Sequence, residues 1–250
     1  MGYLYEIGRG VEQDYAKAIE WYEKAAENGN TYSLNSLGLL YENGNGVEQD
    51  YAKAIEWYEK AIEQGSDTAQ YNLARLYRSG KGVEQDYKKA FELFLLSAVN
   101  GNSNGMHWVG HMYQDGNGVE KNQERAYIWF EKAAEAGISD AMDDLAKCYE
   151  NGLGTEKDLD KAFEWFLKAA ENGLAKSQFA VGTCYENGNG VEKDLNKALE
   201  WYTKAADQGY EKAKSAVDRI TSAVSENEIA EIVDVTVTEE LMNDIMQSLG

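Results

Sequence analysis

The chain has 250 residues, of which 43% are hydrophobic, and its formal net charge at pH 7 is −20. Such an excess of acidic groups would repel the phosphates of a nucleic acid, so we expect no nucleic-acid partner. No stretch approaches the ~18 consecutive apolar residues of a transmembrane helix, so we also expect no membrane-spanning segment.

Two cysteines are too few for a disulfide framework, and we expect Cys148 and Cys184 to be buried free thiols. The chain also opens without an apolar secretory stretch. Both observations favour a reducing, cytoplasmic compartment. The first residues already lie within what should be the first helix of a repeat, so the N-terminus looks truncated.

Glycines recur along the chain at a constant spacing of 36 residues. They close six short turns of the form Gly-x-Gly, at Gly10, Gly46, Gly82, Gly118, Gly154 and Gly190. A fixed period of this length is typical of a stack of copies of one small unit, each contacting its neighbours. We expect the repeat array to occupy residues 1–220 and an acidic tail to occupy residues 221–250.

The elements of one copy are clearest in the second copy. A first helix should begin near Asn30 or Thr31, because such side chains cap a helix N-terminus, and it should end at Gly44. A second helix should follow the capping residue Asp50, carry its apolar residues at helical spacing and end at Gly65. Equivalent positions in successive copies form columns, and no proline interrupts any helix.

The columns resemble a known repeat family. The second copy carries the matching residues Leu37-Gly38, Tyr41, Gly44, Gly46-Val47, Asp50, Lys53-Ala54, Trp57-Tyr58 and Lys60-Ala61. This pattern resembles the Sel-one-like repeat family, which is related to the tetratricopeptide repeats. The resemblance implies an all-α fold, a right-handed α/α superhelical solenoid of 36-residue helix-turn-helix repeats. It also implies a scaffold or adaptor between proteins, and it brings no catalytic motif and no cofactor.

Residues that break the period are the candidates for function. Trp108 lies outside the column that the other tryptophans share, among first-helix positions that face the inner groove in tetratricopeptide repeats. Aromatic and basic residues, which dominate binding hot spots, gather in these positions although the molecule is acidic. We predict that an acidic peptide or partner protein binds along the groove through Tyr71, Arg75, Arg78, His107, Trp108, His111, Lys147 and Phe179. The competing interpretation is that these surface columns vary freely.

His107 and His111 are the only histidines, and their spacing places both rings on one face of a helix. Asp143 and Asp144 occupy corresponding columns of the next copy, but the sequence does not show whether either meets the rings. We therefore favour chance or ligand contact and expect no bound metal. The alternative function is a hydrolase-like or metal-dependent enzyme in the groove, which would need converging ionisable groups that the sequence does not reveal.

Leu95 and Leu96 fall in columns where other copies carry glutamate or lysine. Exposed leucines at such positions indicate a second contact patch, for a dimer or another partner. The competing interpretation is that the two leucines are buried by local packing around Phe91 and Phe94.

The tail, residues 221–250, has seven acidic residues and no lysine or arginine. An acidic, partly apolar tail could dock in its own groove or in that of a second copy. The protein would then be a self-inhibited regulatory subunit or would self-associate. The alternatives are a cap over the last repeat, which we favour, and a disordered segment.

Overall fold

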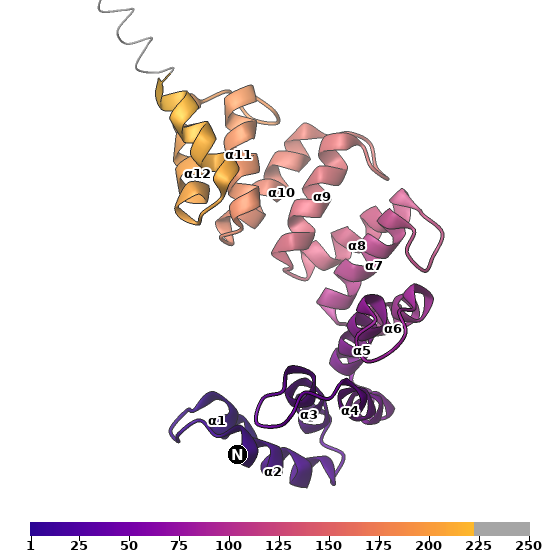
Figure 1. The fold of residues 1–250 in the computed structure, drawn as a ribbon. Helices are drawn as coiled ribbons and strands as arrows, with labels where there is room; N and C mark the ends of the chain where they lie inside the picture. The colour runs from indigo at the N-terminus through magenta and orange to yellow at the C-terminus, as the bar shows by residue number, and fades with distance from the viewer. Residues whose placement is uncertain (223–250) are drawn as a thin grey trace, which may run out of the picture. The chain divides into compact units, whose positions relative to one another are not determined.

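The computed structural model describes residues 1–222, so the acidic tail from residue 223 onward, with the expectations attached to it, lies outside this range. The regular secondary structure of residues 1–222 is α-helical throughout, which confirms the all-α, helix-turn-helix fold (Figure 1). Within the same residues, no helix combines the length and the apolar composition needed to cross a membrane. The helices are α1 (Gly2–Ile7), α2 (Tyr15–Ala26), α3 (Thr31–Asn43), α4 (Tyr51–Glu63), α5 (Asp67–Ser79), α6 (Tyr87–Val99), α7 (Ser103–Asp115), α8 (Gln123–Glu135), α9 (Ser139–Asn151), α10 (Leu159–Glu171), α11 (Ala175–Asn187) and α12 (Leu195–Asp207), and residues 211–222 are helical as well.

The second helix of each copy begins at a capping residue in one column. Before α4, the carboxylate of Asp50 accepts a 3.0 Å hydrogen bond from the backbone N–H of Lys53. This bond satisfies one of the donors that the start of a helix leaves without an intrahelical partner. The predicted cap column is confirmed, because equivalent bonds form at Asp14, Asp86, Asn122, Asp158 and Asp194.

The first helix of each copy ends at the first glycine of the turn. Gly44 has a φ angle of 72°, in the left-handed region that glycine adopts without steric cost. Beyond it the chain folds back, and the N–H of Asp50 donates to the carbonyl of Tyr41 at 2.9 Å. The side-chain amide of Gln49 donates to the carbonyl of Glu42 at 2.7 Å. These bonds fix where the second helix begins relative to the first.

From the second copy onward, the second glycine of the turn contacts the start of the second helix of the preceding copy. A Cβ atom added to Gly118 would lie 2.1 Å from the carbonyl oxygen of Tyr87. This contact sets the register between neighbouring copies, because no larger residue fits there. The same close approach occurs at Gly46 on Tyr15, Gly82 on Tyr51, Gly154 on Gln123 and Gly190 on Leu159.

The described chain forms two compact units. The first unit comprises Met1–Cys148 and Gly152–Glu156, and the second comprises Tyr149–Asn151 and the described residues from Lys157 onward. Within the first unit, each helix from α1 to α7 packs against the next one along the chain. Within the second unit, α11 packs against both α10 and α12.

The core of one copy is seen clearly in the second copy, where it lies between the two helices. In the second copy, Tyr58 of α4 is fully buried against apolar residues of α3 and α5, among them Leu34 and Leu73. Gly38 on α3 makes this packing possible, because a Cβ atom there would lie 2.4 Å from the Tyr58 ring. Small residues in this column therefore let the two helices of a copy approach closely.

The helical segment 211–222 closes the described part of the second unit. Ile220, which is 3% exposed, packs with Tyr202 in the same apolar cluster. Arg219 of this segment falls in the column of Arg75. The segment is therefore the first helix of a seventh copy, and it covers apolar surface that α12 would otherwise leave open.

Cys148 and Cys184 are both buried free thiols, as predicted. Burial raises the pKa of Cys148 to about 11 and that of Cys184 to about 12, because a thiolate loses its hydration there. We expect each thiol to react with iodoacetamide about tenfold or more slowly in the native chain than in the unfolded chain. Time-resolved mass spectrometry checks this, and labelling of a native cysteine at the unfolded rate would contradict its burial.

Candidate functional site

A column of glutamates on the first helices meets a column of tyrosines on the second helices. In the second copy, the hydroxyl of Tyr58 donates a 2.7 Å hydrogen bond to Oε2 of Glu42, and both side chains are buried. Burial raises the pKa of Tyr58, and the hydrogen bond to the Glu42 carboxylate raises it further. We call this contact the tyrosine–glutamate pair, and it also forms between Tyr22 and Glu6 and between Tyr202 and Glu186.

Arg75 supports the tyrosine–glutamate pair of the second copy. Its Nη2 lies 3.4 Å from Oε1 of Glu42, and its Nη1 donates to Oδ1 of Asn72 at 3.3 Å. Asn72 donates in turn to Oδ1 of Asn35 at 2.9 Å, and both asparagines are buried. The Arg75 side chain is 39% exposed, yet its charge is already balanced by a carboxylate of the same chain.

The third and fourth copies lack the tyrosine–glutamate pair. Phe94 and Phe130 replace the tyrosines, and Arg78 and Gln114 replace the glutamates. Aromatic side chains of the first helices pack against both phenyl rings. Trp108 of α7 stacks on Phe94, with the ring centroids 5.7 Å apart and the planes inclined by 14°. The third and fourth copies thus differ from the copies that have the tyrosine–glutamate pair.

Trp108 is half-buried and lies beside a cation. Cζ of Arg78 is 4.0 Å from the centroid of the Trp108 ring, a separation at which cation–π attraction is effective. Nε of Arg78 is buried and has no hydrogen-bond acceptor within the described chain. Trp108 is therefore not sealed in the core, and next to it lies a buried N–H group without an acceptor.

His107 and His111 lie one turn apart on α7, and both meet Asp144 of α9. Nε2 of His107 is 2.8 Å from Oδ2 of Asp144, and Nε2 of His111 is 3.3 Å from the same oxygen. The other ring nitrogen of His111, Nδ1, lies 3.2 Å from Oε1 of Gln114. We call His107, His111 and Asp144 the histidine–aspartate cluster. The sequence does not show whether Asp143 or Asp144 meets the two histidine rings, and in the structure Asp144 does.

The members of the histidine–aspartate cluster shift one another's pKa values. Burial alone would raise the pKa of Asp144, but hydrogen bonds from the two histidines outweigh burial and hold this pKa well below its usual range. Burial alone would lower the pKa of His111, but the hydrogen bond to Asp144, the negative charge of that carboxylate and the hydrogen bond to Gln114 together raise this pKa overall. Lys147 contacts Oδ1 of Asp144 at 3.3 Å and Oδ2 of Asp143 at 2.6 Å, so two carboxylates of its own helix hold it.

The predicted partner-binding residues, Phe179 excepted, lie in the first unit. Tyr71 packs against Phe94 and Arg75, since its ring centroid is 5.7 Å from that of Phe94 and 5.9 Å from Cζ of Arg75. The ring centroids of Trp108 and His111 are 5.6 Å apart. We call the group the first-helix face, and it comprises Tyr71, Arg75, Arg78, His107, Trp108, His111 and Lys147. Contact of these residues with a partner stays a prediction.

Phe179 belongs to the second unit. Its ring centroid lies 5.2 Å from that of Tyr202 and 5.4 Å from that of Tyr210. Its neighbours are thus rings of the repeat itself, and its role in partner binding likewise stays a prediction.

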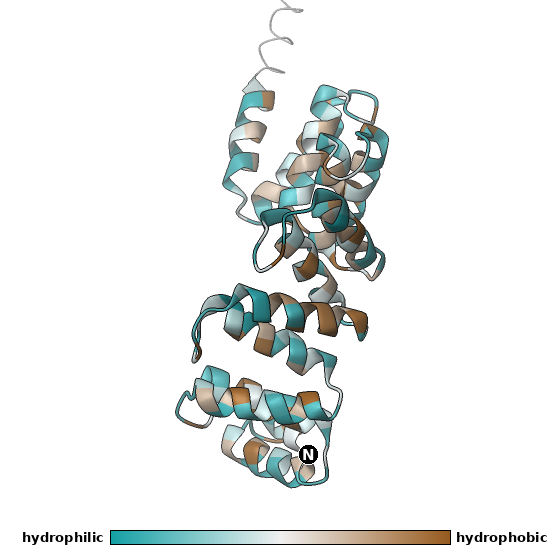
Figure 2. Ribbon diagram, turned by 90° about the vertical axis from the view of Figure 1, so that its right-hand side faces the viewer, coloured by the Kyte–Doolittle hydropathy of each residue, from teal (hydrophilic) through white to brown (hydrophobic). Residues whose placement is uncertain are grey.

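The second predicted patch lies on α6. Leu95 is half-buried, whereas Leu96 is 44% exposed and Val99, one turn further on, is 68% exposed. Figure 2 shows this end of α6 in brown. Local packing covers only part of the patch, and its use as a contact surface stays a prediction.

Glu42 is the residue of this region that the sequence analysis did not single out. An acidic residue on a helix is usually solvated, yet Glu42 is only 6% exposed. A signal for it does exist in the sequence, because the glutamate and the tyrosine 16 residues later change together in the third and fourth copies. The fifth copy is the exception, since it keeps Glu150 with Phe166.

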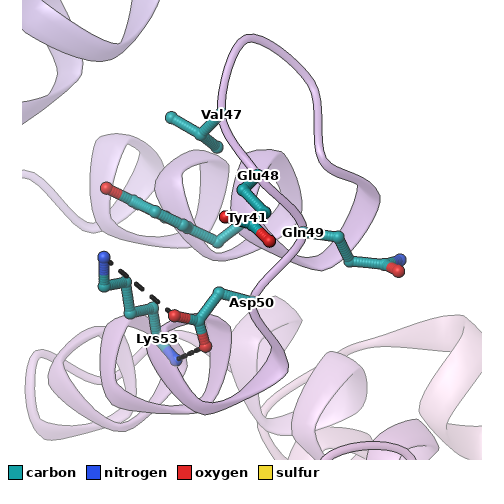
Figure 3. A pocket seen from close by; sticks show the side chains of 6 residues that line it. All are labelled: Tyr41, Val47, Glu48, Gln49, Asp50 and Lys53. Carbon is teal, nitrogen blue, oxygen red and sulfur yellow. Dashed lines mark hydrogen bonds and ion pairs between the residues drawn. The ribbon is translucent and has the colours of Figure 1, made fainter.

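A pocket of about 440 Å³ lies beside the turn of the second copy, lined by Tyr41, Val47, Glu48, Gln49, Asp50 and Lys53 (Figure 3). Nζ of Lys53 lies 5.3 Å from the centroid of the Tyr41 ring. The same lysine–tyrosine contact recurs in other copies, so the pocket belongs to the repeat and offers no specificity of its own.

Comparison with known proteins identifies the repeat. A protective antigen present in uropathogenic Escherichia coli strains displaying an SLR fold is 37% identical, with a TM-score of 0.81 over 88% of this chain. This chain covers 47% of that antigen, or about half its length. A Sel1 repeat protein from Oxalobacter formigenes is 35% identical, with a TM-score of 0.73 and 82% of each chain covered. A search of curated proteins found no match.

The Sel1 repeat itself matches six consecutive segments of the chain, residues 1–30, 31–66, 67–102, 103–138, 139–174 and 175–210. Proteins built from Sel1 repeats generally act as scaffolds for protein–protein interaction and are typically not enzymes. The matched segments coincide with the helix pairs described above, each ending just after a second helix. The chain therefore belongs to the Sel1 repeat family.

Proposed function

We propose that this chain is a scaffold that binds an acidic segment of a partner protein on its first-helix face, with Trp108 and Arg78 as the anchors. The observation that carries the proposal is the half-buried Trp108 beside the unsatisfied Nε of Arg78. Both lie where the repeat's own tyrosine–glutamate pair is missing. Tryptophan and arginine are the side chains most enriched in binding hot spots.

The acidic character of the partner follows from which cations are already neutralised. Arg75 is paired with Glu42, and Lys147 is paired with Asp143 and Asp144. Arg78 has no carboxylate partner within the described chain. A carboxylate of a partner could pair with the charged guanidinium group of Arg78, which is half-buried, and charge-assisted bonds of this kind are about twice as strong as neutral ones.

This assignment divides the residues of the first-helix face by role. Arg75 and Lys147 hold buried carboxylates of the scaffold and keep the first helices in place. Trp108 and Arg78 supply the surface that the partner meets. Tyr71 packs against Arg75 and against Phe94, the ring on which Trp108 stacks.

Selection from a displayed peptide library on the immobilised chain tests the proposal. We expect the enriched peptides to contain aspartate or glutamate, and to bind the R78Q variant about tenfold or more weakly. W108A should weaken the same peptides at least as much, because it removes the apolar anchor. Affinity should fall as salt is added, since the contact is electrostatic.

The matched control is R125Q. Arg125 also lies over an aromatic ring, with Cζ 5.5 Å from the centroid of Tyr113, but it stands where other copies carry the lysine of the recurring lysine–tyrosine contact. R125Q should leave peptide affinity unchanged, and circular dichroism should show native helicity in all three variants. Enriched peptides that bind R78Q and W108A as well as the wild type would refute the site.

A further inference from the structure

The geometry points to a binding site for one divalent transition-metal ion, with Zn²⁺ as the best match, formed by His107, His111 and Asp144. This inference does not rest on the proposed peptide site: His107 and His111 belong to the first-helix face, but the ligands are not the proposed anchors Trp108 and Arg78, and the bound species is different. It concerns the histidine–aspartate cluster alone.

The three ligand atoms already converge. Nε2 of His107 and Nε2 of His111 lie 2.8 and 3.3 Å from one oxygen of Asp144, and all three ligand atoms lie within 4.8 Å of one another. A tetrahedral zinc ion with bonds of about 2.0–2.2 Å separates its ligand atoms by about 3.3–3.5 Å. The side chains therefore need to shift only slightly to surround an ion.

The ligand types suit zinc. Two neutral imidazoles and one carboxylate are a common set of protein ligands for zinc, and a catalytic or exchangeable zinc site has three protein ligands and a solvent molecule in the fourth position. The side chains of His107 and Asp144 are 13% and 14% exposed, and that of His111 is 27% exposed. Solvent can thus reach one side of the cluster and supply the fourth ligand.

Surrounding residues hold the ligands in the orientation that an ion requires. Nδ1 of His111 lies 3.2 Å from Oε1 of Gln114, which can fix the tautomer that leaves Nε2 free for a metal. Oδ1 of Asp144, the oxygen that does not face the histidines, is held by Lys147 at 3.3 Å. The buried Phe130 ring packs against both imidazoles, with centroid distances of 5.8 and 5.1 Å. The ligands lie on two helices, which position them more rigidly than loops would.

The local charge also permits a cation. The ammonium of Lys147 would repel an ion, but Asp143 offsets this charge with a contact of 2.6 Å. The ion would then face the negative charge of the Asp144 carboxylate and two uncharged imidazole rings. The chain as a whole is strongly acidic, which further favours cation binding.

The cluster is not a feature of the repeat. The geometry that brings it together does recur, since Asn72 bonds to Asn35 across neighbouring first helices at the positions equivalent to Asp144 and His107. At the equivalent positions of the other copies, the residues are different. The equivalent trios are Asn35, Leu39 and Asn72; Tyr71, Arg75 and Trp108; Asp143, Lys147 and Ala180; and Phe179, Thr183 and Ala216.

Zinc titration of the full chain, freed of metal and in competition with a chromophoric chelator, tests the inference. We expect one ion per chain, and binding about 100-fold or more weaker in D144N and in H111Q. The control D140N removes the same charge from an exposed position on the same helix, and it should change zinc affinity by no more than about twofold. Circular dichroism checks that each variant is folded.

A second measurement uses the unmodified chain. Because the sequence has only two histidines, proton NMR can follow both rings directly, and zinc should shift the signals of both at one equivalent. A cluster that is held by hydrogen bonds alone would show no zinc binding. That result, unmoved histidine signals, or undiminished binding by D144N would each overturn the inference.

Discussion

Replacing Gly118 by alanine should lower the free energy of unfolding by about 3 kcal/mol or more, because two separate costs add. The φ angle of Gly118 is 72°, and an L-residue with a side chain loses about 1–2 kcal/mol in this left-handed region. The new methyl group would also lie 2.1 Å from the carbonyl oxygen of Tyr87 and 2.7 Å from the backbone nitrogen of Lys88. A backbone cannot move aside by rotating a side chain, so overpacking adds about 1–3 kcal/mol.

The matched control is G137A in the same unit. Gly137 also has a positive φ angle, 91°, but nothing lies within 4 Å of an added Cβ atom. Only the backbone cost of about 1–2 kcal/mol should therefore remain. Urea denaturation followed by circular dichroism measures both variants. Equal losses at the two positions would show that the turn does not set the register between copies.

Changing Tyr58 to phenylalanine should lower the free energy of unfolding by about 2 kcal/mol, although it removes a single oxygen atom. Glu42 is 6% exposed and receives a 2.7 Å hydrogen bond from the Tyr58 hydroxyl. Without that donor, a buried carboxylate is left with the more distant Arg75 at 3.4 Å. Leaving a buried charged acceptor unsatisfied costs more than the bond itself contributes.

The chain itself supplies the compensating change. The fourth copy combines Phe130 with Gln114 at the equivalent positions, so the double variant Y58F/E42Q reproduces an arrangement that the protein already uses. We expect the double variant to recover about 1 kcal/mol relative to Y58F, as a thermodynamic cycle would show. The control Y51F removes an exposed hydroxyl 3.2 Å from Gln49, and should change stability by less than about 0.5 kcal/mol. A double variant less stable than Y58F would contradict the explanation.

Most of the fold could be predicted because each local signal is repeated in every copy. Asp50 and its equivalents cap the second helices, and Gly44 and its equivalents end the first ones. The signals weaken where the first helices of the fifth and sixth copies begin. Ile138 and Leu174 stand there without a side-chain cap bond, so packing against neighbouring helices fixes the start of α9 and α11 instead.

The site could be predicted only in part, because the period reveals which residues are unusual but not what they contact. Trp108, His107 and His111 were found because they break their columns. The burial of Glu42 depends on Tyr58, which comes from the other helix of the copy, and the position of Asp144 depends on how two first helices pack. Neither contact is visible in local spacing.

The neutralisation of Lys147, in contrast, is visible in local spacing. Asp143 precedes it by four residues on the same helix, a separation at which opposite charges meet. The sequence therefore already indicated that this lysine is neutralised within α9.

The contact between each turn glycine and the preceding second helix has an evolutionary consequence. Every junction is made by a copy and its immediate neighbour, and nothing in a junction depends on how many copies lie beyond it. An in-frame duplication or loss of one whole copy would therefore create or remove one joint and leave all the others intact. Recombination can lengthen or shorten such a protein while the surface displayed by each retained pair of copies is inherited unchanged.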